Sequence, residues 1–233
     1  MRYTVSRRKE IVLRVEQNGR VDVDELAVEF GVSEVTIRND LNELDRTGFL
    51  VRSRGGALAV SKLTQELSVR EKYRENSPIK QKLGAAASKL ISDGESILLD
   101  SGTTTEEIAR NLAKFENLRV MTNGLNVANV LNRIDCVSLM LTGGNLRKSS
   151  LSLSGRASEQ SLQNLHFDKV FLGVDGLTMQ SGITTHNETE ANLNRLMCSV
   201  ASEVIAVTDS SKFDKKSFHV ICSCENITRL VTD

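Results

Sequence analysis

Small hydroxyl, amide and charged residues gather at five places from residue 100 onward, each directly after an apolar run. The longest group is Asp100–Thr105, with the sequence DSGTTT. Backbone N–H groups at a helix start can bind phosphate, and threonine hydroxyls add further donors. Lysine or arginine would neutralise the phosphate, and carboxylates would accept hydrogen bonds from sugar hydroxyls, so the combination favours a phosphorylated polyol. The candidate ligand-binding residues are Asp100, Ser101, Gly102, Thr103, Thr104, Thr105, Thr122, Asn123, Gly124, Gly143, Gly144, Arg147, Asp175, Gly176, Thr185, His186, Asn187, Glu188 and Lys212.

The segments that must position these residues alternate between strand-like and helix-like patterns. The expected strands are Ser96–Leu99, Leu118–Met121, Val137–Leu141, Val170–Val174 and Val204–Val207. The expected helices are Lys82–Ile91, Glu106–Lys114, Leu125–Asn132, Arg156–Asn164 and Glu190–Ala201. This alternation predicts an α/β fold with a parallel sheet, whose apolar strands are covered on both faces. Because ligands bind beyond the carboxyl ends of such strands, the five polar loops are predicted to share one site.

The segment Val21–Gly56 has a different pattern, in which two capped helices precede a strand. Asp22 with Glu25 three residues later resembles a capping box. Gly31 suits the left-handed end of the first helix, and Ser33 can cap the second. This layout predicts a winged helix-turn-helix, a device that places one helix in the major groove of DNA.

The second of these helices has one apolar stripe, formed by Ile37, Leu41 and Leu44. If the stripe packs inward, the opposite face meets the groove, where asparagine can pair with adenine and arginine with guanine or phosphate. The strand Phe49–Arg52 leads to a predicted wing tip with arginines beside two glycines. The candidate DNA-binding residues are Ser33, Val35, Thr36, Arg38, Asn39, Asn42, Arg52 and Arg54.

The charge balance restricts how this segment could bind DNA. The 233 residues contain 30 basic and 30 acidic side chains, and residues 1–60 contain ten of each. Neutrality speaks against a non-specific polyelectrolyte binder. It is compatible with a site-specific reader, since Arg7, Arg8 and Lys9 cluster apart from the acids of Asp22–Glu29.

Other signals indicate a cytoplasmic protein. The sequence has no apolar run of membrane-spanning length, and MRYTVSRRKE lacks the apolar core of a signal peptide. The four cysteines are scattered and are expected to be free thiols. His186 has no partner histidine nearby, so no metal site and no cofactor are predicted. The expected organisation is a DNA-binding domain at 1–58, a linker at 59–78 that is partly helical, and a ligand-binding domain at 79–233.

Two sets of motifs resemble those of DeoR-type bacterial transcriptional regulators. The first is SEVTIRNDLNELDRTGFLVRSRGGA, which is similar to their amino-terminal signature. The second is LDSGTTTEEIA, MTNGLNVA, LTGGNLR, FLGVDG and VTDSSKF, in the order found in their effector domain. The match covers nearly the whole chain. Within the family, THNETEANLNRLMC and the IRND form are similar to repressors of N-acetylgalactosamine and galactosamine use.

The resemblance implies a repressor of amino-sugar genes that a phosphorylated sugar releases from its operator. It also implies a sensing domain similar to the ribose-phosphate isomerase type of fold. Asp100–Thr105 would be the phosphate loop, Asp175 and Gly176 would contact the sugar, and Lys212 would be a cationic partner. A homodimer or tetramer is expected, because one recognition helix reads too few base pairs for genomic specificity.

The sequence departs from the family pattern in two respects. Many members have arginine where this chain has Asn39, and histidine where it has Arg54, so the operator sequence cannot be transferred from the family. Similar regulators also continue through another helix and strand after the position of Asp233, which predicts a C-terminally truncated effector domain.

Alternative interpretations remain at this point. A capped helix pair with a glycine turn also fits an ordinary helical hairpin, and Gly, Ser, Thr and Asp are ordinary turn residues. Asp100, Asp175 and Lys212 at strand ends could isomerise a sugar phosphate by proton transfer, which would make the protein an enzyme. A DNA-binding architectural protein without a ligand would leave the five polar strand ends unexplained.

Overall fold

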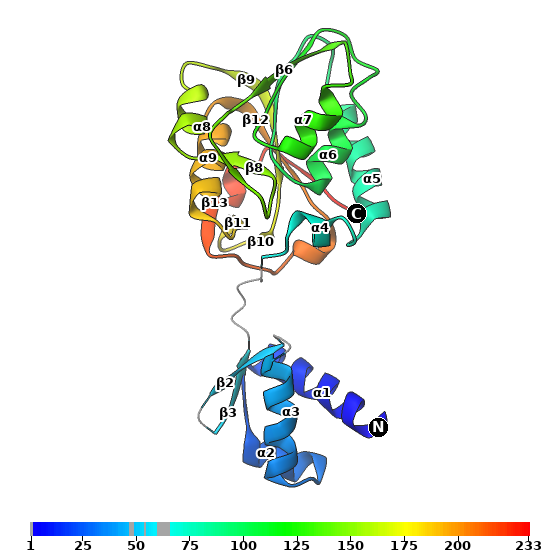
Figure 1. Cartoon of the computed structure of the whole chain (residues 1–233), viewed down its shortest axis with the longest axis vertical. Coiled ribbons are helices and arrows are strands. Elements are labelled where there is room, and N and C mark those ends of the chain that lie inside the picture. The colour runs from blue at the N-terminus through cyan, green and yellow to red at the C-terminus, as the bar shows by residue number, and fades with distance from the viewer. Residues whose placement is uncertain (1, 47–48, 54, 60–65) are drawn as a thin grey trace. The chain divides into compact units, whose positions relative to one another are not determined.

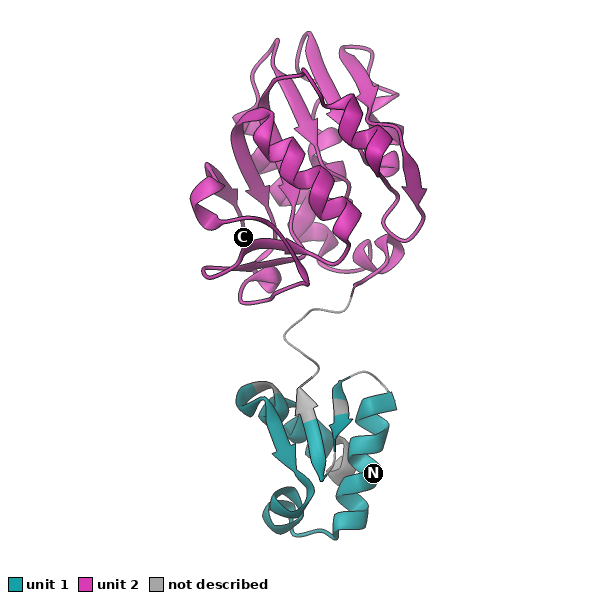
Figure 2. Ribbon diagram, turned by 90° about the vertical axis from the view of Figure 1, so that its left-hand side faces the viewer, with its two compact units in different colours: residues 1–63 teal, residues 64–233 magenta. Residues whose placement is uncertain are grey.

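The computed structural model describes residues 2–46, 49–53, 55–59 and 66–233. It divides into two compact units, Met1–Leu63 and Thr64–Asp233 (Figure 2). Each unit has its own hydrophobic core, so the two are described separately.

Unit 1 is a winged helix-turn-helix. Its helices are α1 (Arg2–Asn18), α2 (Val23–Phe30) and α3 (Glu34–Arg46). Three short antiparallel strands follow the order β1 (Arg20–Asp22), β3 (Gly56–Ala59) and β2 (Leu50–Ser53) (Figure 1). The predicted stripe of Ile37, Leu41 and Leu44 is buried in the core of this unit. A Cβ atom at Gly56 would lie only 2.0 Å from the carbonyl oxygen of Val21, so the close approach of β3 to β1 requires glycine there.

The two predicted helix caps differ in outcome. Ser33 Oγ accepts a hydrogen bond from the backbone N–H of Thr36 at 3.3 Å, as a cap of α3. The capping box at Asp22 is wrong, because the Asp22 side chain makes no cap hydrogen bond. Its carboxylate instead pairs with Arg20 at 2.6 Å across the short strand β1, so a nearby guanidinium competes successfully for the same oxygen atoms.

Unit 2 is built on a six-stranded parallel sheet. Its strands, in spatial order, are β14 (Arg229–Val231), β12 (Ala201–Val207), β9 (Phe167–Gly173), β4 (Ser96–Leu99), β5 (Leu118–Thr122) and β6 (Val137–Leu141). Successive side chains leave opposite faces of a strand. Accordingly, Ile97 and Leu99 enter one core cluster and Leu98 the other, which explains why the strands are apolar throughout.

Helices cover both faces of this sheet (Figure 1). On one face lie α5 (Ser77–Ala87), α6 (Thr103–Ala109) and α7 (Leu125–Leu131). On the other lie α8 (Arg156–Ser161) and α9 (Glu188–Ser199). These elements correspond to the predicted alternation, with boundaries shifted by a few residues.

Most of the short elements of unit 2 were not predicted from the sequence. Three antiparallel strands form a second small sheet in the order β10 (Gly176–Thr178), β11 (Gly182–Thr185) and β13 (His219–Cys222). The strands β7 (Asn145–Arg147) and β8 (Ser152–Ser154) pair with each other. Short 3-10 turns occupy Ser88–Leu90, Ser210–Lys212 and Cys224–Asn226. Three-residue strands carry too little periodicity to stand out from turn residues in a sequence.

The order of the strands places the crevice of the sheet between β4 and β9. The chain moves from β4 through β5 to β6 in one direction, and then from β9 through β12 to β14 in the other. Strands that diverge in this way leave an opening at their carboxyl ends, where open α/β sheets bind ligands. The backbones of the two strands are joined there by the bond from Asp100 N–H to Phe171 O, at 3.0 Å.

The second half of the expected linker packs on unit 2. Residues 66–76, which we call the strap, contain the short helix α4 (Val69–Lys72). Ser68 and Glu71 form a capping box at its start. The strap is held to unit 2 by the bond from Val69 N–H to Ser149 O, at 2.7 Å. Residues 60–65 lie outside the described residues.

No helix among the described residues is long and apolar enough to cross a membrane. All four cysteines are free thiols. In the part of the chain that the structure describes, no group of three or more His, Cys, Asp and Glu side chains could hold a metal ion.

Candidate functional site

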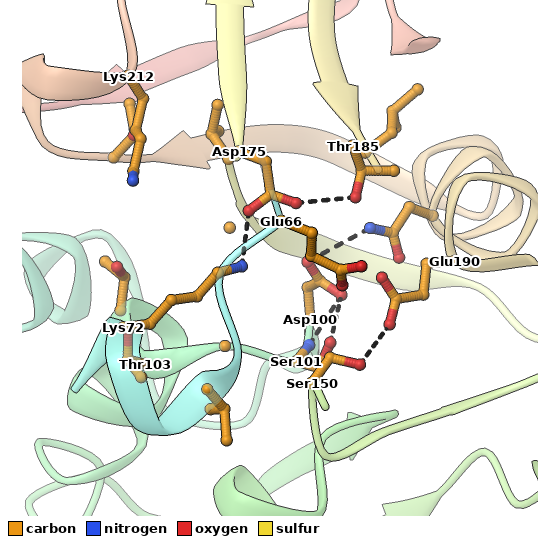
Figure 3. Close-up of a pocket in the computed structure, with 18 of the residues that line it drawn as sticks. Glu66, Lys72, Asp100, Ser101, Thr103, Ser150, Asp175, Thr185, Glu190 and Lys212 are labelled. Atoms are coloured by element: carbon orange, nitrogen blue, oxygen red, sulfur yellow. Dashed lines mark hydrogen bonds and ion pairs between the residues drawn. The ribbon is translucent and has the colours of Figure 1, made fainter. Parts of the chain in front are cut away.

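A pocket lies at the carboxyl ends of β4, β9 and β12 (Figure 3). Its wall is formed by the loops after these strands, the strap, the start of α5 and one face of α9, together with Ser150, Thr185 and Ile221. Five carboxylates and three lysines line it. They are Glu66, Asp100, Asp175, Glu190 and Asp209, with Lys72, Lys80 and Lys212.

Asp100 is the first residue after β4 and is only 5% exposed. Its carboxylate accepts hydrogen bonds from Ser101 N–H at 2.8 Å and from Asn194 Nδ2 at 3.3 Å. No described cation lies within ion-pair distance of it. Burial, followed by the neighbouring Glu190 carboxylate, raises the pKa of Asp100 to about 7. The group therefore changes its charge near neutral pH.

Asp175 follows β9 and, unlike Asp100, is paired with a cation. Its carboxylate accepts from Lys72 Nζ at 2.7 Å and from Thr185 Oγ1 at 2.9 Å. Burial favours the neutral acid, but the Lys72 ammonium outweighs it and the pKa of Asp175 is lowered. Burial also acts to lower the pKa of Lys72, but the ion pair with Asp175 raises it. Both groups are thus held in their charged forms, and the strap is tied to the end of β9.

Three lysines from separate segments converge on the pocket. Lys72 comes from the strap, Lys80 from α5 and Lys212 from the turn after β12. Lys80 Nζ donates to the backbone carbonyl of Lys72 at 2.5 Å. Burial lowers the pKa of Lys80, Asp209 opposes this, and the two other lysines lower it further. An anion placed among these ammonium groups would relieve their mutual repulsion.

Glu190, on the opposite side of the pocket from Lys72 and Lys212, is held by a group of donors (Figure 3). Its Oε1 accepts hydrogen bonds from Ser150 at 2.6 Å and from Ser152. Arg147 reaches the same oxygen at 3.4 Å and also forms a bidentate pair with Glu66. This pairing with Glu66 raises the pKa of the Arg147 guanidinium and lowers that of Glu66.

Eight of the predicted ligand-binding residues line this pocket. They are Asp100, Ser101, Gly102, Thr103, Thr104, Asp175, Thr185 and Lys212. All of them follow β4, β9 or β12, or lie in the small sheet beside them. The structure thus brings together three of the five polar strand ends.

The predicted residues after β5 and β6 do not line the pocket, which corrects the expectation that five loops share one site; from this part of the chain Ser150, in the turn between β7 and β8, is a lining residue. With the crevice between β4 and β9, β6 is the edge strand two strands beyond β4, roughly 10 Å away at the usual strand spacing, whereas β12 is only one strand beyond β9. The residues concerned are Thr122, Asn123, Gly124, Gly143 and Gly144, and none of them lines the pocket. Their roles are local: Thr122 Oγ1 accepts from Gly124 N–H at 2.9 Å, and a side chain on Gly144 would collide with Ser158.

The remaining predicted residues support the wall without lining it. Thr105 is fully buried and donates to Gly102 O at 3.1 Å, and a Cβ on Gly176 would collide with Lys215 O. Asn187 caps α9 by accepting from the N–H groups of Thr189 and Glu190. Glu188 in the first turn of α9 is exposed to solvent.

Arg147 and His186 stand immediately behind the pocket. Arg147 positions Glu66 and Glu190, as described above. His186 shares a 3.4 Å hydrogen bond with Ser217. Burial lowers the pKa of His186, although Asp175 and Glu66 act against it. A neutral imidazole beside the Lys72–Asp175 pair is the expected state at neutral pH.

Sequence reasoning missed several wall residues, among them Glu66, Lys72, Lys80, Glu190 and Asn194. One signal was present for the last two. They are four residues apart on α9, and both are buried on the face that carries the apolar residues Ala191 and Met197. Polar residues on the buried stripe of an amphipathic helix indicate a site.

The exposed face of α3 carries most of the predicted DNA-binding residues. Ser33, Val35, Arg38, Asn39 and Asn42 are exposed, and Thr36 is half-buried. Arg38 pairs with Glu34 at 2.7 Å. Among the described residues none forms a hydrogen bond with the Asn39 side chain, which leaves its donor and acceptor free.

Two arginine groups differ from the sequence interpretation. Arg52 does not extend freely from the wing: its Nε donates to Asn42 Oδ1 at 3.0 Å, and its Nη1 donates to Gly56 O. Arg7 and Arg8 lie within α1 and bind the buried Asp40 of α3, at 2.6 and 2.7 Å. They hold two helices together in addition to contributing positive charge. Arg54 lies outside the described residues.

Family models match both units. A DeoR-like helix-turn-helix domain matches residues 7–63, and a DeoR C-terminal sensor domain matches residues 75–233. The chain is 48% identical over 232 residues to a putative aga operon transcriptional repressor of Escherichia coli O157:H7, covering 99% of this chain and 86% of the relative. It is 36% identical over 227 residues to the HTH-type transcriptional regulator GlpR of Haloferax volcanii, covering 97% and 89%.

A ribose 5-phosphate isomerase A from Methanocaldococcus jannaschii is similar in structure over 60% of this chain and 55% of its own, with 17% identity and a TM-score of 0.45. That likeness is too low to bear on function. The named sequence relatives are regulators, which removes the support for an isomerase-like enzyme. Together the two domain matches show that this chain belongs to the DeoR family of helix-turn-helix transcriptional regulators.

Proposed function

We propose that this regulator represses genes of amino-sugar catabolism in the cytoplasm and leaves its operator when a phosphorylated sugar enters the pocket at β4, β9 and β12. The observation that carries the proposal is the convergence of Lys72, Lys80 and Lys212 on one side of that pocket. A sugar phosphate needs cationic neutralisation, and it needs acceptors for its hydroxyls, which Asp100 and Asp175 supply. The similarity to the putative aga operon repressor supports the amino-sugar pathway.

The strap offers a physical route from the pocket to the DNA-binding unit. Three of its residues bind groups around the pocket: Glu66 binds Arg147, Lys72 binds Asp175, and Asn76 binds Asp209 at 3.1 Å. The strap also follows directly, in sequence, the residues that join the two units. A phosphate that draws Lys72 away from Asp175 would weaken one of these ties.

The coupling free energy between effector binding and DNA binding must exceed a minimum for the response to be useful. The effector must bind the state that cannot hold DNA more tightly, and a useful response needs about 1–3 kcal/mol of coupling or more. The protein is proposed to act as a homodimer or tetramer, since a single copy of α3 reads too few base pairs.

The test is a fluorescence anisotropy titration of the full chain on DNA from upstream of its own gene. Galactosamine 6-phosphate, N-acetylgalactosamine 6-phosphate and galactose 6-phosphate are added in turn, with the three unphosphorylated sugars as matched controls. The proposal expects at least one phosphorylated sugar to weaken operator binding at concentrations where its unphosphorylated form does not. Operator binding that none of the six compounds alters would refute induction by a sugar phosphate.

A further inference from the structure

The pocket has more acidic than basic groups. Five carboxylates face three lysines, and Arg147 behind the wall supplies a fourth cation. The phosphate of a sugar phosphate adds between one and two negative charges at neutral pH. Asp100 is only partly ionised near neutral pH, so the charges of the pocket itself nearly cancel, and a ligand that brings only a phosphate gives the pocket an excess of negative charge. A ligand with its own positive charge reduces it.

The groups are also separated within the pocket. Lys72 and Lys212 lie on one side, and Glu190 lies on the other (Figure 3). Asp100 lies on the same side as Glu190, because it accepts a hydrogen bond from Asn194, which is on the same helix as Glu190. A ligand that is anionic at one end and cationic at the other would match this arrangement.

The side of the pocket that contains Asp100, Glu190 and Asn194 has hydrogen-bond acceptors without a described donor. Asn194 is 4% exposed and gives its Nδ2 to Asp100, while its Oδ1 has no hydrogen-bond partner among the described residues. A buried oxygen without a partner is costly unless a ligand supplies a donor. The hydrogen bonds that Glu190 receives from described residues all end on Oε1, so a second carboxylate oxygen remains for a ligand.

We infer that Asp100, Glu190 and Asn194 form a subsite for an ammonium group, which makes a hexosamine phosphate with a free amine the preferred effector. This rests on the proposed function, because the phosphate end must lie among the lysines. An ammonium group has three N–H donors and one positive charge. The amide of an N-acetyl sugar has one donor, no charge and an acetyl group that the buried wall would have to accommodate, and a plain sugar brings only a hydroxyl.

The experiment measures the dissociation constants of three probes on the full chain by isothermal titration calorimetry: galactosamine 6-phosphate, N-acetylgalactosamine 6-phosphate and galactose 6-phosphate. Galactosamine 6-phosphate is expected to bind about 10-fold to 100-fold more tightly than the other two, as a charge-assisted hydrogen bond allows. Glu190→Gln keeps the shape of the side chain and removes its charge, so it should abolish most of this preference. Glu159→Gln is the matched control, because Glu159 also stands in the first turn of a helix but lies outside the pocket lining.

The outcomes separate this inference from the proposed function. Equal affinity for all three probes, or a preference that survives Glu190→Gln, overturns the ammonium subsite and leaves a sugar-phosphate sensor intact. Binding of none of the three overturns both. The ranking in the unaltered chain does not depend on the variant, and an unchanged melting temperature of ligand-free Glu190→Gln shows that its loss of preference is not a loss of fold.

Discussion

Both units of this protein bury carboxylates at junctions between elements, and two of these carboxylates, Asp40 and Asp100, have opposite electrostatic surroundings. Asp40 in unit 1 is 2% exposed and is bound by both Arg7 and Arg8. Asp100 in unit 2 is 5% exposed, and amide groups rather than cations bind it. Burial alone therefore does not distinguish an acid that joins two helices from one that we propose to bind a ligand.

The two sites differ in which groups surround the buried carboxylate. Arg7 and Arg8 neutralise the charge on Asp40 within the protein, and these ion pairs join α1 to α3. The pocket around Asp100 instead keeps a buried acid that no described cation binds, and an Asn194 oxygen that has no hydrogen-bond partner among the described residues. Such imbalance is costly to the empty protein and is characteristic of binding sites. We therefore expect changes at Asp40 to affect the fold, and changes at Asp100 to affect ligand binding and pH dependence.

The largest effect is expected for Asp40→Ala. It leaves two arginines facing a buried space without their acid, and breaking a buried pair in this way costs about 3–5 kcal/mol. Hydrogen–deuterium exchange of α1 and α3 in the full chain measures the loss. Glu34→Ala, which removes an exposed partner of Arg38, is the control and should cost less than about 1 kcal/mol. Equal effects of the two variants would break the contrast between the units.

The second prediction concerns pH. The pKa of Asp100 is raised from 3.8 to about 7, so the folded state keeps a proton that the unfolded state releases. Its contribution to the free energy of unfolding is therefore fully present below about pH 4 and is lost as the pH rises to about 7. The loss amounts to a few kcal/mol for a shift of roughly three pKa units. Asp100→Asn should flatten this part of the pH profile of thermal unfolding of unit 2; an unchanged slope would mean that Asp100 is ionised throughout.

The same contrast occurs on a smaller scale within unit 1, between Asn39 and Arg52. The Asn39 side chain is exposed and has no described partner, so it is available to a base edge. Asn39→Ala should cost about 1–3 kcal/mol on the operator and change the preference at one base position. Binding to operator variants, measured beside random DNA of equal length, checks this. An equal loss on operator and random DNA would contradict base reading.

The smallest effect is expected for Arg52→Ala. Since Arg52 binds Asn42 and Gly56 O, its removal should cost about 1 kcal/mol by loosening the wing from α3. The slope of the logarithm of affinity against that of salt concentration should stay unchanged. A slope reduced by about one would instead show that Arg52 neutralises a DNA phosphate.

Much of the fold follows from local patterns. The apolar runs at Ser96–Leu99 and Val204–Val207 could be identified as buried strands, and the stripe at Ile37, Leu41 and Leu44 predicted the inward face of α3. Asp100 and Asp175 could be placed at strand ends for the same reason. Short elements such as β7 and β10 could not be predicted, since three residues carry no usable periodicity.

Many of the residues that line the pocket could not be predicted from the sequence. Lys72 was placed in a linker, because nothing in its neighbourhood reveals a partner 103 residues away. Glu190 and Asn194 carried a faint local signal as polar residues on the buried stripe of α9. Arg7 and Arg8 could be identified only as part of a basic cluster, since the acid that binds them lies on another helix.

The sequence by itself determined the longer strands and helices, which faces are apolar, and that polar groups end the strands, because these properties depend on residues a few positions apart. Only the tertiary structure decided that three of the five strand ends meet, because the order of strands in a sheet is set by long-range packing. It also decided which charges are paired. Coulomb energy depends on distance in space, and neither the balance at Asp40 nor the imbalance at Asp100 can be read from neighbours along the chain.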